Sequence, residues 1–176
     1  FHEVQKARDL GKNLVIAKRR QAGFSAKFSS IIGREFSMFR GSQSIILAGE
    51  DKYAQNTMKM VLAGLNALAD TEFYKRRTPD TSEYIQAKYR VNEGGNWVWR
   101  GFMSEVYCFT AKSNEQAISG KSPSIVLFEE AGRFKGLIET FKYVEPSLEA
   151  NFKKTGIAYV VGTGGDMDKG AAELEE

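Results

Sequence analysis

Apolar residues along the chain follow two repeating patterns. Short runs that are largely apolar predict strands buried on both faces. These expected strands cover residues 13–17, 44–48, 105–110, 124–128 and 157–161. Between them lie longer segments with apolar residues three or four positions apart, which predicts amphipathic helices. The expected helices cover residues 3–12, 25–40, 51–70 and 137–151.

A third pattern predicts a β-hairpin. Residues 85–92 and 96–102 alternate between polar and apolar side chains, and a Glu-Gly-Gly turn separates them. Trp97 and Trp99 lie on the second strand of this hairpin and face two cations on the first. Aromatic rings beside cations can stack on nucleic acid bases. Paired aromatics on one strand face more often belong to the core, and we favour that interpretation.

Strands that alternate with helices predict an α/β fold. Because the strands are continuously apolar, we expect a mainly parallel β-sheet with helices on both faces and a β-hairpin insertion. Ligands in such sheets bind at the carboxyl ends of the strands. Three polar segments follow expected strands at these ends: residues 18–25, Glu129 with Glu130, and residues 162–165. We therefore expect them to form one site.

Composition narrows the chemistry of that site. The 176 residues fit one domain, and a single cysteine with a single histidine excludes a Cys/His zinc site and an internal disulfide. Residues 1–40 carry nine Lys or Arg and three acids, which suits phosphate partners, although a solvated charged surface explains such a bias more often. No apolar run is long enough to span a bilayer, so we expect no membrane partner.

The first polar segment has the components of a phosphate-binding loop. Such a loop needs a glycine for a tight turn, free amides at a helix start, a cation and a hydroxyl group for magnesium. Gly23, Lys18 and Ser25 can supply them, although Phe24 occupies the usual place of the lysine. A strand-to-helix loop with a serine cap would explain the same residues. The residues expected to bind the nucleotide are Lys18, Arg19, Arg20, Gln21, Ala22, Gly23, Phe24 and Ser25.

The other two segments add carboxylates and a hydroxyl group. Of two acids after a buried strand, the first can hold magnesium and the second can orient a water molecule, as Glu129 and Glu130 would. A strand that simply ends in an acidic turn is the alternative. Thr163 lies in a glycine-rich turn, where a small hydroxyl residue could sense the terminal phosphate.

In their order and spacing, the three segments resemble the ATPase domain of the large terminase subunit of tailed double-stranded DNA viruses. Several of these proteins carry a deviant phosphate loop with lysine first and an aromatic residue after the glycine, as Lys18, Gly23 and Phe24 do here. Residues 109–113 and 118–120 also look terminase-like. The resemblance covers roughly residues 13–165 and implies a P-loop NTPase of the additional-strand, catalytic-glutamate class.

The resemblance also implies a role for each site residue. Lys18 would contact the β- and γ-phosphates, and Ser25 would bind Mg²⁺ with help from Glu129. Glu130 would be the catalytic base, and Thr163 would couple hydrolysis to movement.

Two positions depart from the family's pattern. The family usually has aspartate where Glu129 stands. Many members carry an arginine at the position of Ser119, which some use as a finger into a neighbouring subunit, and here Lys121 lies two residues on. We therefore expect Lys121 to serve in catalysis. Other candidates for this positive charge are Arg19, Arg20 and Arg133, and Gln5 is a candidate for contacting adenine.

These observations predict a magnesium-dependent ATPase domain of a viral DNA-packaging motor, using ATP and Mg²⁺. We expect residues 1–176 to be one P-loop ATPase domain of a longer chain, with the family's nuclease domain outside it. The expected partners are double-stranded DNA, the portal protein, the small terminase subunit and further copies in a homo-oligomeric ring. The expected location is the host cell cytoplasm, at the viral procapsid. The alternatives are a helicase or other ATP-driven nucleic acid translocase, and a non-catalytic nucleotide-binding assembly module.

Overall fold

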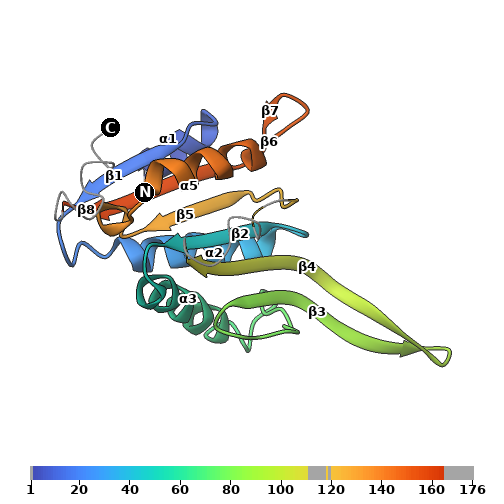
Figure 1. The fold of residues 1–176 in the computed structure, drawn as a ribbon. Helices are drawn as coiled ribbons and strands as arrows, with labels where there is room; N and C mark the ends of the chain where they lie inside the picture. Colours follow the sequence, from blue (N-terminus) through green and yellow to red (C-terminus); the bar gives the residue numbers. More distant parts are fainter. Residues whose placement is uncertain (1, 111–117, 119, 165–176) are drawn as a thin grey trace.

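The computed structural model describes residues 2–110, 118 and 120–164, which form a six-stranded sheet covered by helices (Figure 1). In spatial order, the strands are β1 (Leu14–Lys18), β8 (Ile157–Thr163), β5 (Ile125–Glu129), β2 (Gln43–Ala48), β4 (Asn96–Thr110) and β3 (Tyr84–Glu93). Every neighbouring pair is parallel except β3 and β4, which form the antiparallel hairpin. The expected mainly parallel sheet with a hairpin insertion is confirmed.

Helices lie on both faces of this sheet, as expected. One face packs against α1 (His2–Asp9), α2 (Phe24–Met38) and α3 (Asp51–Asn66). The other face packs against α5 (Leu137–Val144) and two short 3₁₀ helices, η1 (Ala131–Arg133) and η2 (Glu145–Leu148). A small hairpin of β6 (Glu149–Ala150) and β7 (Lys153–Lys154) lies outside the main sheet.

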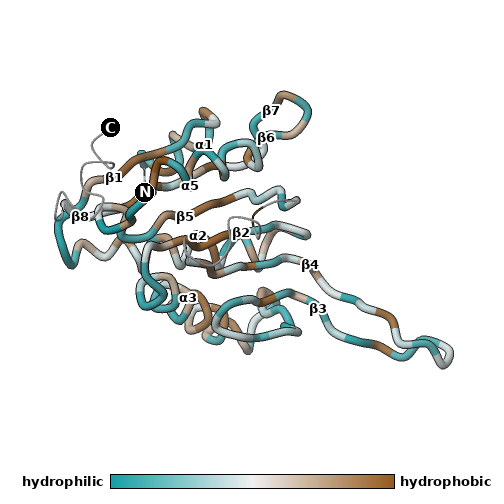
Figure 2. The backbone as a smooth tube through the Cα atoms, in the orientation of Figure 1, coloured by the Kyte–Doolittle hydropathy of each residue, from teal (hydrophilic) through white to brown (hydrophobic). Residues whose placement is uncertain are grey.

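The two layers explain why the central strands are continuously apolar. Successive side chains of a strand point to opposite faces of the sheet. In β5, Ile125 and Leu127 pack on the side of α2 and α3, whereas Val126 and Phe128 pack on the side of α5. Both faces are therefore dry, and the tube in Figure 2 is brown along β5.

The last two of the expected helices end well before the sequence pattern predicts. The helix expected over 51–70 ends at Asn66, and hydrogen-bonded turns follow as far as Tyr74. The helix expected over 137–151 ends at Val144, since Pro146 lacks the amide donor that would continue the helical hydrogen bonds. The chain then forms η2 and the β6–β7 hairpin instead.

The hairpin is longer than predicted. The strands expected over 96–102 and 105–110 are one continuous strand, β4, which bends at Gly101 (φ 132°) and Met103 (φ 62°) without ending. The outer half of the hairpin projects beyond the helices (Figure 1). Trp97 and Trp99 are consequently 61% and 40% exposed, and the interpretation that they belong to the core is wrong.

The backbone approaches itself closely where the chain enters β8. A Cβ atom at Gly156 would lie 2.0 Å from the carbonyl oxygen of Pro123 and 2.9 Å from a methyl group of Leu148. Backbone atoms cannot yield as a flexible side chain can. Gly156→Ala should therefore lower the free energy of unfolding by about 2 kcal/mol or more, measured by urea denaturation.

Gly64→Ala is the matched control for this prediction. Gly64 lies inside α3, and a Cβ atom there would have no neighbour within 4 Å. Alanine favours the helix, so this change should raise the free energy of unfolding by about 0.5 to 1 kcal/mol. Equal stabilities of the two variants would contradict the close approach at Gly156.

Candidate functional site

The three polar segments meet at the carboxyl ends of three adjacent strands. Parallel pairing places β8 between β1 and β5, and it sets Lys18 opposite Thr163. Glu129 is the last residue of β5, with Val161 of β8 as its partner. The predicted convergence of the three segments is confirmed, and β8 lies between the strand that leads into the loop and the strand that ends in the acidic pair.

The loop between β1 and α2 ends in a helix start without a side-chain cap. Gly23 is the N-cap residue of α2, and its positive φ of 72° is a conformation that glycine adopts readily. No side chain caps the first turn, which also carries no acid. The amides of that turn can therefore donate to an anion. Because Ser25 does not act as the cap, the serine-cap explanation of this segment is wrong.

Ser25 instead binds the first acid of the pair. Its hydroxyl group donates a hydrogen bond to Oε1 of Glu129, which is 2% exposed. The other carboxylate oxygen, Oε2, is buried and has no hydrogen-bond partner among the described residues. Burial raises the pKa of Glu129, while the Ser25 hydrogen bond and the charge of Lys18 act in the opposite direction. A buried carboxylate oxygen beside a serine hydroxyl suits a magnesium ion.

The second acid is held by two other strands. Glu130 is the N-cap residue of η1 and has left-handed backbone angles (φ 50°, ψ 47°), an unusual conformation for a glutamate. Its Oε1 accepts a hydrogen bond of 2.8 Å from Nζ of Lys18, and its Oε2 accepts one of 3.1 Å from the hydroxyl of Thr163. The Lys18 side chain is only 6% exposed, so this ion pair is largely shielded from water.

The remaining candidates lie outside this cluster. Lys121 precedes β5, near the amino ends of the strands, and its ammonium lies 3.9 Å from the centroid of the Tyr107 ring. Arg133 of η1 donates a hydrogen bond of 2.6 Å to the hydroxyl of Tyr53. Gln5 bonds to Asp9 on its own helix at 2.8 Å.

Arg19 and Arg20 of the loop are exposed. The expected terminase-like residues 111–113 and 119, and residue 165 of the glycine-rich turn, lie outside the described residues.

A cleft beside the loop was not predicted from the sequence. It has a volume of about 490 Å³ and lies between α1, the outer edge strand β1 and the start of α2. Its lining residues are His2, Glu3, Val4, Leu14, Val15, Ile16, Ala17 and Phe24. Val15 is 59% exposed although it belongs to an apolar run. Periodicity cannot reveal this exposure, because it arises from the position of β1 at the edge of the sheet.

The described residues contain no group of three or more His, Cys, Asp or Glu side chains that could hold a metal ion. A divalent ion beside Ser25 and Glu129 would therefore have few ligands from the described chain. Its other ligands would be water and the bound substrate, as is usual for Mg²⁺.

No helix in the described part of the chain is both long and apolar enough to cross a bilayer.

Comparison with solved structures identifies the fold. The ATPase domain of the Thermus phage P74-26 large terminase matches with a TM-score of 0.64 and 18% sequence identity, over 84% of this chain and 58% of that one. A mutant of the same domain gives the same values. The HK97 bacteriophage large terminase matches with a TM-score of 0.60 and 13% identity, over 90% of this chain and 30% of that one.

No family model and no curated protein matches the sequence. At these identities, the matches show the fold alone. The chain has the fold of the phage large terminase ATPase domains, as the sequence resemblance implied. It spans 58% of the length of the Thermus phage domain.

Loss of charge at Glu130 and at Glu129 should have different effects on the free energy of unfolding. Glu130→Gln leaves the shielded ammonium of Lys18 without its carboxylate, so the free energy of unfolding should fall by about 1 to 3 kcal/mol. Glu129→Gln removes a buried charge with one unpartnered oxygen, so stability at neutral pH should stay equal or rise by about 1 kcal/mol. Urea denaturation without nucleotide or divalent ions measures both.

Acidification should narrow the difference in free energy of unfolding between Glu129→Gln and the wild type. The raised pKa of Glu129 means that the folded state binds the proton more tightly than the unfolded chain. Wild-type stability relative to the variant should therefore increase as the pH falls through that raised pKa. A Glu129→Gln variant destabilised as much as Glu130→Gln would contradict this account.

Proposed function

We propose that this chain is a P-loop ATPase domain of the additional-strand, catalytic-glutamate class, and that it belongs to a DNA-packaging terminase. One observation carries the proposal. A lysine, two glutamates and a threonine at the carboxyl ends of three adjacent parallel strands meet a serine in the first turn of an uncapped helix. This combination of cation, amides, hydroxyl and paired carboxylates is what ATP hydrolysis requires.

The loop from Lys18 to Ser25 would bind the phosphates of ATP. The free amides after Gly23 would donate to phosphate oxygens, and Lys18 would supply the positive charge. Lys18 already lies within the site, so it can serve from the start of the loop although Phe24 occupies the usual lysine position. Arg19, Arg20, Gln21 and Ala22 would form the rest of the loop around the phosphates.

Ser25 and Glu129 would hold Mg²⁺. The ion would neutralise charge that develops on the phosphates during hydrolysis. Glutamate reaches one methylene further than the aspartate usual in the family. The direct contact of Glu129 with Ser25 supports this role despite that difference.

Glu130 would act as the catalytic base. Lys18 and Thr163 each hold one of its carboxylate oxygens, which fixes the group at the mouth of the site. When phosphate oxygens compete for Lys18, Oε1 of Glu130 would become free to accept a proton from the attacking water. Thr163 would remain bonded to Oε2, and through it the state of Glu130 would be coupled to β8.

The cleft between α1 and β1 would receive the nucleobase. It adjoins the loop at Ala17 and Phe24 and offers the exposed face of Val15 to a flat ring. This assignment replaces Gln5, which is bonded to Asp9.

A further cation would come from a neighbouring copy. Among the described residues, Lys18 is the only cation bonded to Glu130, and the transition state of phosphoryl transfer needs additional positive charge. Lys121, Arg19, Arg20 and Arg133 are candidates to act in a neighbour's site. This requirement fits a homo-oligomeric ring.

The proposed biological setting follows the fold. As in a packaging motor, hydrolysis would move double-stranded DNA into a procapsid. The partners would be the portal protein and the small terminase subunit, in the host cell cytoplasm. The whole packaging activity would belong to a longer protein that contains these 176 residues.

Replacement of the proposed base should abolish turnover. In the full-length protein, Glu130→Gln should lower ATP turnover by about a hundredfold or more while ATP still binds. Steady-state phosphate release and binding of a fluorescent ATP analogue would measure the two effects separately. Equal turnover above background in wild type and Glu130→Gln would eliminate Glu130 as the base. If both proteins turn over ATP only at the background rate, a non-catalytic nucleotide-binding module is favoured.

Replacement of the loop lysine should weaken nucleotide binding. Lys18→Ala should lower ATP affinity by about tenfold or more, since a charged hydrogen bond contributes about 1.5 to 3 kcal/mol. Lys153→Ala, which removes an exposed lysine from β7, is the control and should leave affinity unchanged. If Lys18→Ala binds ATP as tightly as the control, the proposed role of the loop is wrong.

A further inference from the structure

The outer part of the β3–β4 hairpin, residues 88–101, forms an arm that projects beyond the helices (Figure 1). It begins beyond the β-bulge between Gln86 and Lys88. Because β4 runs parallel to β2, its carboxyl end lies at the edge of the sheet that holds the candidate site. Its amino end, at the arm tip, therefore points away from that edge. The arm is therefore a surface separate from the candidate site that holds Lys18 and Glu130.

One face of the arm carries aromatic rings and cations. Antiparallel pairing places Arg90 opposite Trp99 and Asn92 opposite Trp97, and opposing residues share a face. Nζ of Lys88 lies 4.5 Å from the centroid of the Trp99 ring, and the guanidinium of Arg90 lies 5.1 Å from it. Both tryptophans are exposed, so their rings remain accessible to a ligand.

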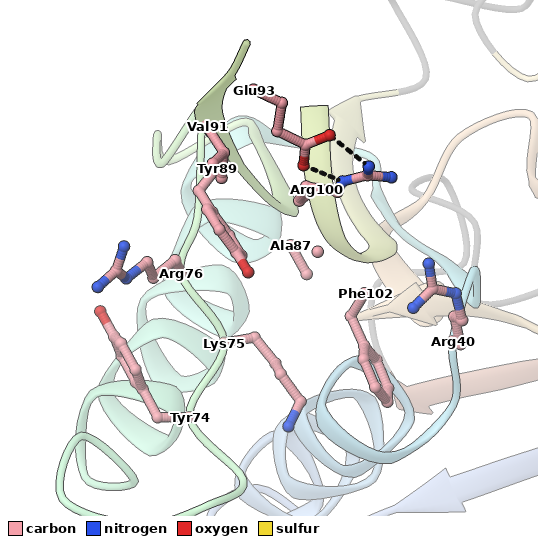
Figure 3. A pocket seen from close by; sticks show the side chains of 11 residues that line it. Arg40, Tyr74, Lys75, Arg76, Ala87, Tyr89, Val91, Glu93, Arg100 and Phe102 are labelled. Atoms are coloured by element: carbon pink, nitrogen blue, oxygen red, sulfur yellow. Dashed lines mark hydrogen bonds and ion pairs between the residues drawn. The ribbon is translucent and has the colours of Figure 1, made fainter. Parts of the chain in front are cut away.

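The face with the tryptophans has no carboxylate. Glu93 is the one acid between residues 88 and 101. It bonds to Arg100 through two hydrogen bonds of 2.9 and 2.8 Å, as Figure 3 shows. Its charge is therefore already neutralised within the arm. The positive charges of Lys88 and Arg90 are left for a partner.

The opposite face of the arm lines a basic cleft. The cleft has a volume of about 850 Å³ and lies between the arm and the loop after α3. That loop contributes Lys75 and Arg76, which lie over the rings of Phe102 and Tyr89 at 4.7 and 5.3 Å (Figure 3). Arg40 lines the same cleft, and Glu93 is the only acid among its lining residues. Two basic segments that are separate in the sequence thus meet around the arm.

We propose that the arm binds nucleic acid. Nucleic acids combine flat bases with a regular row of negative charges, and exposed aromatics interleaved with cations match both. Trp97 and Trp99 would stack on bases or pack on sugars, while Lys88 and Arg90 contact phosphates. Lys88 and Arg90 share their face of the arm with no carboxylate, and a row of phosphates supplies the negative charge that this face lacks. The inference deepens the proposed function by assigning a nucleic-acid-binding surface to this chain. It rests on the proposed function only for the link to ATP turnover.

The test measures binding by the full-length protein without nucleotide. Fluorescence anisotropy would follow a labelled oligo(dT) of about 20 nucleotides and a mixed-sequence duplex of the same length. The double variant Trp97→Ala/Trp99→Ala should bind at least one of these probes about tenfold or more weakly. Trp97→Phe/Trp99→Phe should restore much of the affinity, because it keeps the aromatic rings.

The cations are tested by the salt dependence of binding. Lys88→Gln/Arg90→Gln should weaken binding and reduce the slope of log affinity against log salt by about 1 to 2. Lys153→Gln/Lys154→Gln removes the same charge from the β6–β7 hairpin and should leave the slope unchanged. A larger tryptophan effect on oligo(dT) would identify stacking on single strands. Similar effects on both probes would identify contact with the duplex backbone.

If both arm variants bind both probes as tightly as the wild type does, the inference is overturned and the arm is left as a protein contact surface. Basal ATP turnover, measured without nucleic acid, should be unchanged in every arm variant. If the wild type binds nucleic acid through the arm but never hydrolyses ATP, the proposed function fails and the arm assignment stands.

Discussion

The ion pair between Lys18 and Glu130 is the contact on which the rest of the site depends. The two residues are separated by 112 positions, and they meet only because β8 lies between β1 and β5 in a parallel sheet. The pair brings the loop and the acidic turn to the same place, and Thr163 joins it from the strand between them. A change in strand order or register would separate all three groups at once.

The same short turn gives two adjacent carboxylates different environments. Glu129 ends a buried strand, so burial raises its pKa and leaves one oxygen unpartnered. Glu130 is turned outward by its left-handed backbone and has a partner on each oxygen. Neighbouring acids with unlike surroundings can perform unlike tasks. Here the backbone conformation of a single residue produces the difference.

The sequence predicted the sheet, its covered faces and the meeting of three segments, because buried parallel strands leave a continuous apolar signal and their carboxyl ends share an edge. It could not predict what each side chain touches. The core interpretation of Trp97 and Trp99 is wrong because alternation shows a shared face without showing whether a helix covers it. The cleft beside Val15 depends on how α1 packs against an edge strand. The partners of Lys18 and Ser25 depend on strand order, which local patterns do not encode.

The continuity of β4 has a mechanical consequence. This one strand runs for 15 residues, about 50 Å along the chain, from the arm tip to the edge of the sheet where the candidate site lies. Its inner part is hydrogen-bonded to β2, which is in turn paired with β5 and ends beside Glu129. Tension on the tip along the strand would load these hydrogen bonds in shear, together rather than one after another. The arm is thus anchored in the sheet through β4, and a force on its tip would act on the sheet through the bend at Gly101 and Met103.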